Sequence, residues 1–135
     1  MITIEQIRPE LTWRLRRRVM YPNKKLYEME MEEDNLGYHF GAFKGDSLVG
    51  VVSLFQQGTD FQFRKFAVDI DMQNMGIGKT LLNYIEDFAI AEGAKRIWCN
   101  SRVTAMGFYS RYGFAGTGTR YTQNGIDYEV MEKTI

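Results

Sequence analysis

The sequence contains little cysteine, histidine or proline, and it has no excess of charge of either sign. A single cysteine, Cys99, excludes an internal disulfide, which is typical of proteins in a reducing cytoplasm. One cysteine and one histidine also leave no set of zinc ligands, so we predict no metal cofactor. The 17 basic and 17 acidic residues cancel, whereas nucleic-acid-binding domains are usually basic. We therefore predict no nucleic-acid partner.

Long apolar runs are missing as well. No stretch approaches the roughly 18 apolar residues of a membrane-spanning helix, and Met1 leads into Ile-Thr-Ile-Glu without a secretory apolar region. We therefore predict a cytoplasmic protein with no membrane partner. With 135 residues, 44% of them hydrophobic, the chain is long enough for one domain, residues 1–135, with a single core.

The apolar pattern predicts a mixed α/β order of elements. Strands at about 38–43, 48–55 and 61–68 are separated by turns that contain glycine. An amphipathic helix over 76–92 leads to a strand over 95–99, whose parallel pairing with 61–68 follows from the helical crossover. The other expected elements are a half-buried strand around Ile2 and Ile4, a short helix over 103–112, and a final antiparallel pair, 114–118 and 126–131, joined by Asn124-Gly125.

A helix after residue 9 is expected to carry Leu11, Leu15 and Val19 on one face. The acidic segment 26–34 follows it and has no clear periodicity, although a short helix is expected there. The rest of the first helix is rich in arginine. These arginines either form a solvated surface or supply one side chain to the border of a substrate groove: Arg14, Arg16, Arg17 and Arg18.

The most informative stretch joins the strand 61–68 to the helix 76–92. Gly76 and Gly78 lie at the helix start, where backbone N–H groups lack partners and the helix dipole is positive. Residues without a Cβ let a phosphate or pyrophosphate approach this backbone closely, and Lys79 adds a positive charge. The stretch therefore predicts an anion-binding site.

Spacing separates three phosphate-binding motifs. A P-loop would have glycine where Gln73 stands, and a dinucleotide fingerprint would have its third glycine where Leu81 stands. The pattern Gln73-x-x-Gly76-x-Gly78 instead resembles the coenzyme A pyrophosphate loop of the GNAT superfamily of N-acetyltransferases.

A second motif strengthens this resemblance. Residues 100–114 follow the pattern Asn-x4-Ala-x2-Phe-Tyr-x3-Gly-Phe, which is similar to the other hallmark of the superfamily and stands at the matching interval. The resemblance is sharp from about Gln62 to Phe114 and architectural outside it. It implies a mixed, mostly antiparallel sheet of six or seven strands, about four helices, and a central parallel strand pair that splays apart.

The resemblance also implies an activity. The expected function is transfer of an acetyl group from acetyl-coenzyme A directly to an amine of a small molecule, a protein or a peptide. The alternative is a non-catalytic module of the same fold that binds or senses an acyl-coenzyme A. No motif specifies the acceptor or the oligomeric state, and a homodimer is compatible with the sequence.

By the same resemblance, Tyr109 would protonate the departing thiolate; its alternative role is packing with Phe108 and Tyr112. Backbone groups near Phe66 and Val68 would pair with pantetheine, and an N–H near Val68 would stabilise the thioester oxygen. The residues expected to bind the coenzyme are Phe66, Ala67, Val68, Gln73, Asn74, Met75, Gly76, Ile77, Gly78, Lys79, Thr80, Asn100, Phe108 and Arg111.

The sequence does not specify the general base. Some relatives carry glutamate where Gln62 stands, and an amide accepts no proton at a useful pH. Gln62 and Arg64, on one face of their strand, are predicted to border the acceptor. Cys99 is expected to be a small buried residue rather than a nucleophile. The candidates that remain open for the base are water, His39, Glu32, Glu33 and Asp34.

Overall fold

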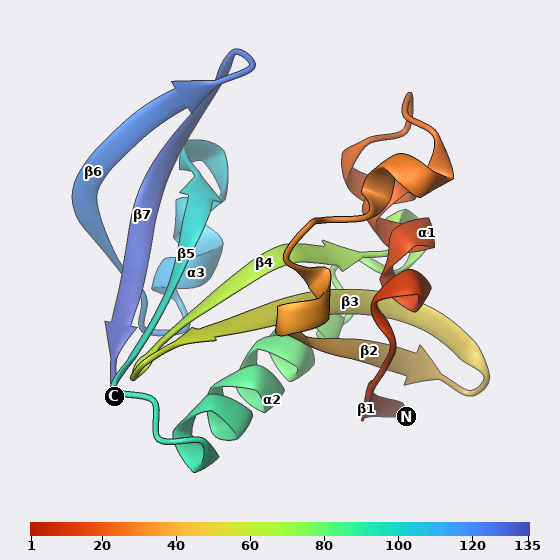
Figure 1. The fold of residues 1–135 in the computed structure, drawn as a ribbon, viewed down its shortest axis with the longest axis horizontal. Helices are drawn as coiled ribbons and strands as arrows, with labels where there is room; N and C mark the ends of the chain where they lie inside the picture. The colour runs from red at the N-terminus through yellow and green to blue at the C-terminus, as the bar shows by residue number, and fades with distance from the viewer.

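The computed structural model describes residues 1–135, which build one seven-stranded sheet in the order β1-β2-β3-β4-β5-β7-β6 (Figure 1). Every neighbouring pair is antiparallel except β4 and β5, which run parallel. The predicted mixed, mostly antiparallel fold is therefore confirmed. The strands are β1 (Ile2–Gln6), β2 (Tyr38–Lys44), β3 (Ser47–Gln57), β4 (Asp60–Val68), β5 (Arg96–Arg102), β6 (Ala115–Gln123) and β7 (Ile126–Thr134).

The structure has three α-helices rather than about four. α2 (Ile77–Ala91) is long, and α3 (Met106–Ser110) is short. The predicted first helix is an irregular N-terminal run, in which α1 (Trp13–Leu15) continues into a π-helical turn, Arg16–Met20. None of the helices has the length and apolar character needed to cross a membrane. Short 3₁₀ turns cover Pro9–Thr12, Leu26–Met29, Asp34–Leu36, Ile70–Met72 and Val103–Ala105.

The two faces of the sheet are covered by different segments. In Figure 1, β1 to β4 lie between α2 on one side and the N-terminal run on the other. Leu15 of that run packs against Val51 and Ala67 in a small core, whereas Leu11 is exposed. α2 packs its buried face against β2, β3 and β4 in the main core, with the predicted helical spacing. The buried residues of α2 are Ile77, Leu81, Leu82, Ile85 and Ala89.

A bulge in β4 decides which of its side chains face α2. Lys65 has a φ of 55°, and the register between β3 and β4 shifts at this point. Strict alternation from Phe63 would turn Ala67 toward α2. Because the bulge adds one residue, Phe66 joins Phe63 in the main core instead, and Ala67 faces the N-terminal run.

The parallel pairing of β4 with β5 is short. Beyond Gln62 the two strands diverge, and Figure 1 shows β5, β7 and β6 rising away from β1 to β4. The splayed parallel pair that the resemblance implied is therefore present, and the edge of β4 that faces β5 is open from Phe63 to Val68. The paired residues are Asp60 with Arg96, Phe61 with Ile97 and Gln62 with Trp98.

The last two strands are longer than predicted. β6 runs to Gln123 and β7 to Thr134, and the turn between them is at Asn124-Gly125, as expected. Asn124 and Gly125 both have positive φ, which suits a two-residue hairpin turn. Every residue of β6 is exposed. Its sequence therefore lacks the alternation of apolar and polar residues from which the length of the strand could be predicted.

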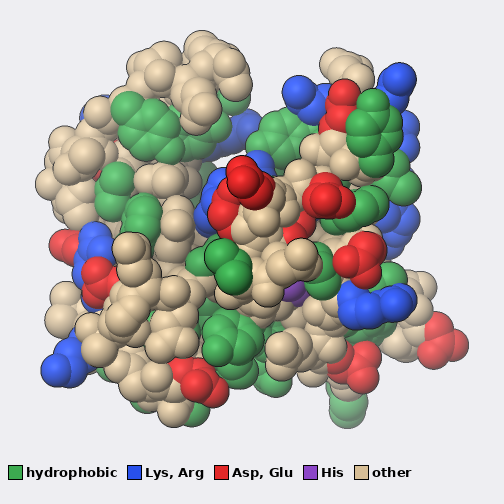
Figure 2. Space-filling view, in the orientation of Figure 1, with side chains coloured by type: hydrophobic (Ala, Val, Ile, Leu, Met, Phe, Trp, Pro, Cys, Tyr) green, Lys and Arg blue, Asp and Glu red, His purple; other side chains and the backbone are tan.

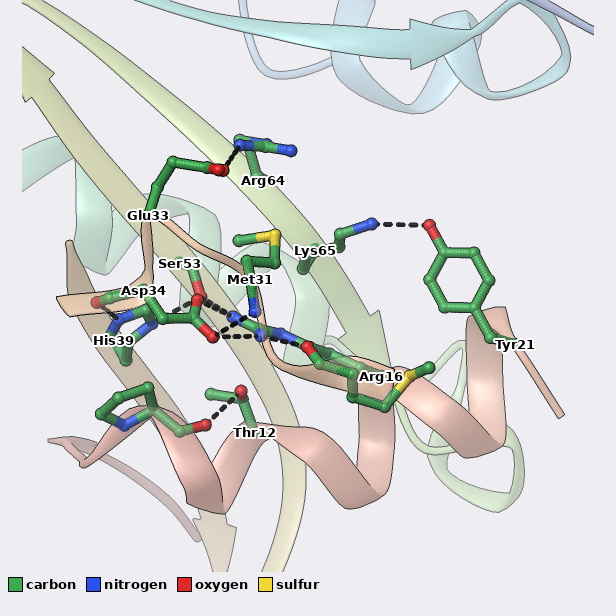
Figure 3. Close-up of polar contacts among 12 residues, drawn as sticks. Thr12, Arg16, Tyr21, Met31, Glu33, Asp34, His39, Ser53, Arg64 and Lys65 are labelled. Atoms are coloured by element: carbon green, nitrogen blue, oxygen red, sulfur yellow. Dashed lines mark hydrogen bonds and ion pairs between the residues drawn. The ribbon is translucent and has the colours of Figure 1, made fainter. Parts of the chain in front are cut away.

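Arg16 is fully buried and so is no part of a solvated arginine face, which was one of the two alternatives for this helix. Its guanidinium makes two bonds of 2.9 Å to the carboxylate of Asp34 and also donates, at 2.9 Å each, to Ser53 Oγ and to the Met29 carbonyl (Figure 3). The ring nitrogens of His39 lie 2.7 Å from Ser53 Oγ and from the Asp34 carbonyl oxygen. This buried network fastens the acidic segment to the sheet.

The neighbouring arginines have other roles. Arg18 pairs with Asp69 and Asp71, both at 3.0 Å, and Arg14 lies 4.0 Å from Asp69. Arg17 is exposed. These ion pairs connect the N-terminal run to the loop that follows β4.

Ionisation of Asp34 balances the buried charge of Arg16. Burial alone would raise the pKa of this carboxyl, but the hydrogen bonds from Arg16 and from the Met31 backbone N–H, at 3.0 Å, outweigh it and hold the pKa below its ordinary value. The carboxylate is therefore charged at neutral pH.

We predict that Asp34→Asn lowers the free energy of unfolding by about 3–5 kcal/mol at pH 7, because Arg16 is left buried without a counter-ion. The native pKa of Asp34 lies below its unfolded value of about 3.9. The carboxylate therefore stabilises the fold above that pH, and its contribution is lost as the pH falls through the native pKa. The difference between wild type and variant should shrink below about pH 4, as measured by urea unfolding at several pH values.

The half-exposed pair of Glu33 with Arg64 supplies the control. Glu33→Gln should cost less than about 1 kcal/mol, because solvent screens that pair. If Glu33→Gln and Asp34→Asn lowered the free energy of unfolding equally, burial of the ion pair would not determine the cost of breaking it.

Candidate coenzyme site

A cleft of about 480 Å³ opens where the end of β4, the start of α2 and α3 meet. Most of the residues predicted to bind the coenzyme line it. Val19, Met72 and Tyr112 also line it, although the sequence indicated no role for them there. Val19 reaches the cleft only because the N-terminal run packs beside β4, and no local pattern reveals such a contact. The predicted residues that line the cleft are Phe66, Val68, Gln73, Asn74, Gly76, Ile77, Gly78, Lys79, Phe108 and Arg111.

The backbone at the start of α2 presents unpaired donors to this cleft. The N–H groups of residues 76–79 bond to no other group of the chain. Thr80 differs, because its N–H and its hydroxyl both donate to the Gly76 carbonyl, at 3.1 and 2.9 Å. The free donors therefore end at Lys79, one residue earlier than predicted.

The two glycines of the loop differ in backbone conformation and in surroundings. Gly76 has a φ of 82°, a conformation that strains any residue with a Cβ. Gly78 has no such constraint, and a Cβ there would lie 3.4 Å from the rings of Phe66 and Phe108, an ordinary contact. Gly78 lines the cleft, so its lack of a side chain leaves more of the cleft open to a ligand.

The cleft is positively charged. Lys79 and Arg111 are the charged residues that line it, and neither forms an ion pair within the chain. The positive end of the α2 dipole adds to their field. Gln73 shapes the loop, because its side-chain amide donates to the Val68 carbonyl at 3.1 Å. Together these groups suit phosphate oxygens.

Aromatic rings from α3 fill the wedge between β4 and β5. The ring centre of Tyr109 lies 5.6 Å from that of Phe63, 6.4 Å from Phe66 and 5.2 Å from Phe108. Phe66 and Phe108 line the cleft, whereas Tyr109 does not line it and packs against both of these rings. Burial, with a smaller effect of Cys99, raises the pKa of Tyr109 above its ordinary value. The phenol is therefore protonated at neutral pH.

The remaining predicted residues lie outside the cleft. Ala67 is buried on the opposite face of β4, against Leu15. Met75 is exposed in the loop before α2, and Asn100 is exposed on β5. The donors of Thr80 are used within α2. None of these four residues lines the cleft.

Gln62 and Arg64 share the face of β4 that lies opposite α2. Arg64 Nη1 lies 2.7 Å from Glu33 Oε2, and Figure 3 shows this pair beside the buried network. Among the candidates for the base, His39 and Asp34 are only 2% and 4% exposed, so they cannot reach a substrate. The side chains that remain are Glu33, which is paired, and Glu32, which is exposed.

Cys99 is the buried residue that the sequence predicted. It is 3% exposed, and burial raises its pKa to about 12, so the reactive thiolate is not populated at neutral pH. No three side chains of His, Cys, Asp or Glu gather in a way that would hold a metal ion.

Both the sequence and the fold are similar to those of known proteins. Residues 9–135 match the family model described as acetyltransferase (GNAT) domain. The uncharacterized N-acetyltransferase YitI of Bacillus subtilis (strain 168) is 25% identical over 145 positions, covering 100% of this chain and 97% of YitI. The crystal structure of a Lactobacillus plantarum protein has a TM-score of 0.88 at 18% identity, covering 98% of this chain and 97% of that one. A GNAT family acetyltransferase from Elizabethkingia anophelis with acetyl-CoA bound has a TM-score of 0.79 at 20% identity, covering 99% and 98%.

The family match spans nearly the whole chain and includes both motifs and the cleft. The chain therefore belongs to the GNAT acetyltransferase family, and it is an acyltransferase of the N-acetyltransferase class.

Gly78→Glu should weaken coenzyme A binding by about 100-fold or more, because it adds bulk and negative charge beside the free N–H groups of α2. The fold should persist, since the new Cβ makes only ordinary contacts. Calorimetric titration measures the affinity. Gln57→Glu adds the same charge at an exposed position of the β3–β4 hairpin, away from the cleft, and should bind normally. Wild-type affinity in Gly78→Glu would refute the assignment of the anion site.

Proposed function

We propose that the protein transfers an acetyl group from acetyl-coenzyme A directly to an amine of a small molecule, a protein or a peptide. The observation that carries this proposal is the cleft, where free N–H groups and two unpaired cations adjoin the open edge of β4. The pyrophosphate would bind at residues 76–79, with Lys79 and Arg111 beside the phosphates. Acetyl-CoA in the Elizabethkingia anophelis structure supports this assignment. The proposal includes the cytoplasmic location predicted from the sequence and allows for a homodimer.

The open edge of β4 would hold the pantetheine arm. Strand β5 has left this edge beyond Gln62, so the backbone groups of Phe66 and the N–H of Val68 are available to an extended ligand, whereas the Val68 carbonyl already accepts the Gln73 amide. A backbone N–H near Val68 would then face the thioester oxygen and stabilise its developing negative charge.

The chemistry needs a neutral nucleophile and a proton for the leaving sulfur. A lysine-like amine with a pKa of about 10.4 is neutral for only about 0.04% of the time at pH 7, so a site that favours the neutral form speeds the reaction. The amine nitrogen attacks the carbonyl carbon, the carbon–nitrogen bond forms and the carbon–sulfur bond breaks. The sulfur would take its proton from Tyr109, and the nitrogen would release its surplus proton to water positioned by Gln62.

A panel of amines with acetyl-coenzyme A tests the proposal. Release of free coenzyme A, together with the acetylated amine identified by mass spectrometry, is the expected result. A protein that binds acetyl-coenzyme A tightly but acetylates no amine would contradict transfer.

Tyr109→Phe should reduce turnover by about 10²–10⁴-fold, the usual contribution of general acid catalysis. Coenzyme A affinity and stability should change little, because the ring keeps its packing. Since burial raises the pKa of Tyr109, the wild-type acid should be lost only above about pH 10. Tyr84→Phe removes the same oxygen from an exposed position of α2 and serves as the control. Unchanged turnover in Tyr109→Phe, with chemistry rate-limiting, would reduce this residue to packing.

Gln62→Ala should lower turnover only modestly, because an amide has no basic site in the working pH range. Any inflection between about pH 6 and 8 in the pH–rate profile of the wild type should persist in the variant. Disappearance of that inflection would mean that Gln62 organises the true base.

A further inference from the structure

We infer that the acceptor amine carries a carboxylate, which binds in a second pocket on the far side of β4 from α2. This inference rests on the proposed function, because it names the class of acceptor. The pocket has a volume of about 220 Å³. Two methionines line it together with Arg16, Tyr21, Lys24, Glu28 and Lys65.

The two lysines of this pocket lack counter-ions. Lys65 Nζ donates to the Tyr21 hydroxyl at 2.6 Å and lies 4.6 Å from the centre of its ring. Neither Lys65 nor Lys24 forms an ion pair within the chain. The adjacent Arg64, in contrast, is neutralised by Glu33. Figure 3 shows Lys65 directed toward Tyr21 and Arg64 directed toward Glu33.

The pocket also contains a buried donor without an acceptor. Arg16 lines the pocket and is 0% exposed, and its Nε–H has no partner although its other nitrogens are bonded. Glu28 is the only carboxylate in the lining, and it already accepts the Lys25 N–H at 3.0 Å. The pocket therefore has more hydrogen-bond donors than acceptors and more positive than negative charge. A carboxylate would supply both acceptors and negative charge.

The position of Lys65 links this pocket to the coenzyme cleft. Lys65 directly precedes Phe66, which lines the cleft, so the pocket and the cleft flank the same stretch of β4, on opposite faces of its open edge. Figure 2 shows positively and negatively charged side chains intermingled over the N-terminal run and the acidic segment, beside the hollow between them and the β5–β7 half. The volume equals roughly seven waters of liquid, enough for a carboxylate on a short chain. An acceptor with its carboxylate beside Lys65 would direct its amine toward the open edge of β4, where the thioester would lie.

The test compares α- and ω-amino carboxylic acids with their carboxamides, at saturating acetyl-coenzyme A. The wild type should have the higher kcat/KM for the acids. Lys65→Met keeps the apolar stem and should lower kcat/KM for the best acid by about 10- to 100-fold, mainly through KM, with less effect on its amide. Lys24→Met should act in the same direction. Lys44→Met, at an exposed position on β2, should leave the preference unchanged.

Direct binding keeps the two proposals separable. The best-binding acid is titrated into the coenzyme A complex while the backbone amide signals of Lys65 and Tyr21 are followed by NMR. Saturable shifts that weaken in Lys65→Met support the subsite, even if no amine is acetylated and the proposed activity fails. Acids acetylated no better than their amides, or a preference that survives in both Lys65→Met and Lys24→Met, would overturn the subsite while leaving the transferase intact.

Discussion

Beyond Gln62 and Trp98, β4 and β5 share no ladder, so one edge of a central strand stays open in the middle of the sheet. Such an edge is stable only if its polar groups find other partners and its flank is filled. β3 holds β4 from the other side and β7 holds β5 along its whole length. Rings from α3 fill the wedge, with Tyr109 against Phe63. These contacts hold β4 and β5 apart. The gap between them determines that the coenzyme cleft lies beside the start of α2.

The bulge at Lys65 determines which face of β4 the side chains around it point toward. It turns Phe66 toward α2 and the cleft, and it directs Lys65 toward the N-terminal run. On that side of the sheet, the acidic segment is held in place by the buried pair of Arg16 with Asp34. A buried ion pair adds little net stability compared with apolar packing, but breaking it is costly. We therefore see its role as fixing the position of the acidic segment over the sheet.

The order of elements and α2 were predictable because apolar spacing and the glycines around position 76 are local signals. The strand divergence came only from family resemblance, since no local pattern encodes it. The burial of Arg16 was not predictable, because its partners lie 18 and 37 residues away and a run of arginines normally indicates a solvated face. The bulge was equally hidden, since a lysine at positive φ has no sequence signature. For this reason the sequence indicated the loop at residues 73–79 but missed the pocket beside Lys65.

The central claim is that the open edge of β4 and the free N–H groups of α2 hold one extended ligand. Amide hydrogen exchange measured by NMR, with and without saturating coenzyme A, tests it most directly. We predict that coenzyme A slows exchange at residues 76–79 and along the β5-facing edge of β4 near Phe66 and Val68. Thr80, whose N–H is already bonded within α2, should change much less. Protection confined to other parts of the chain, or absent at residues 76–79, would contradict the claim.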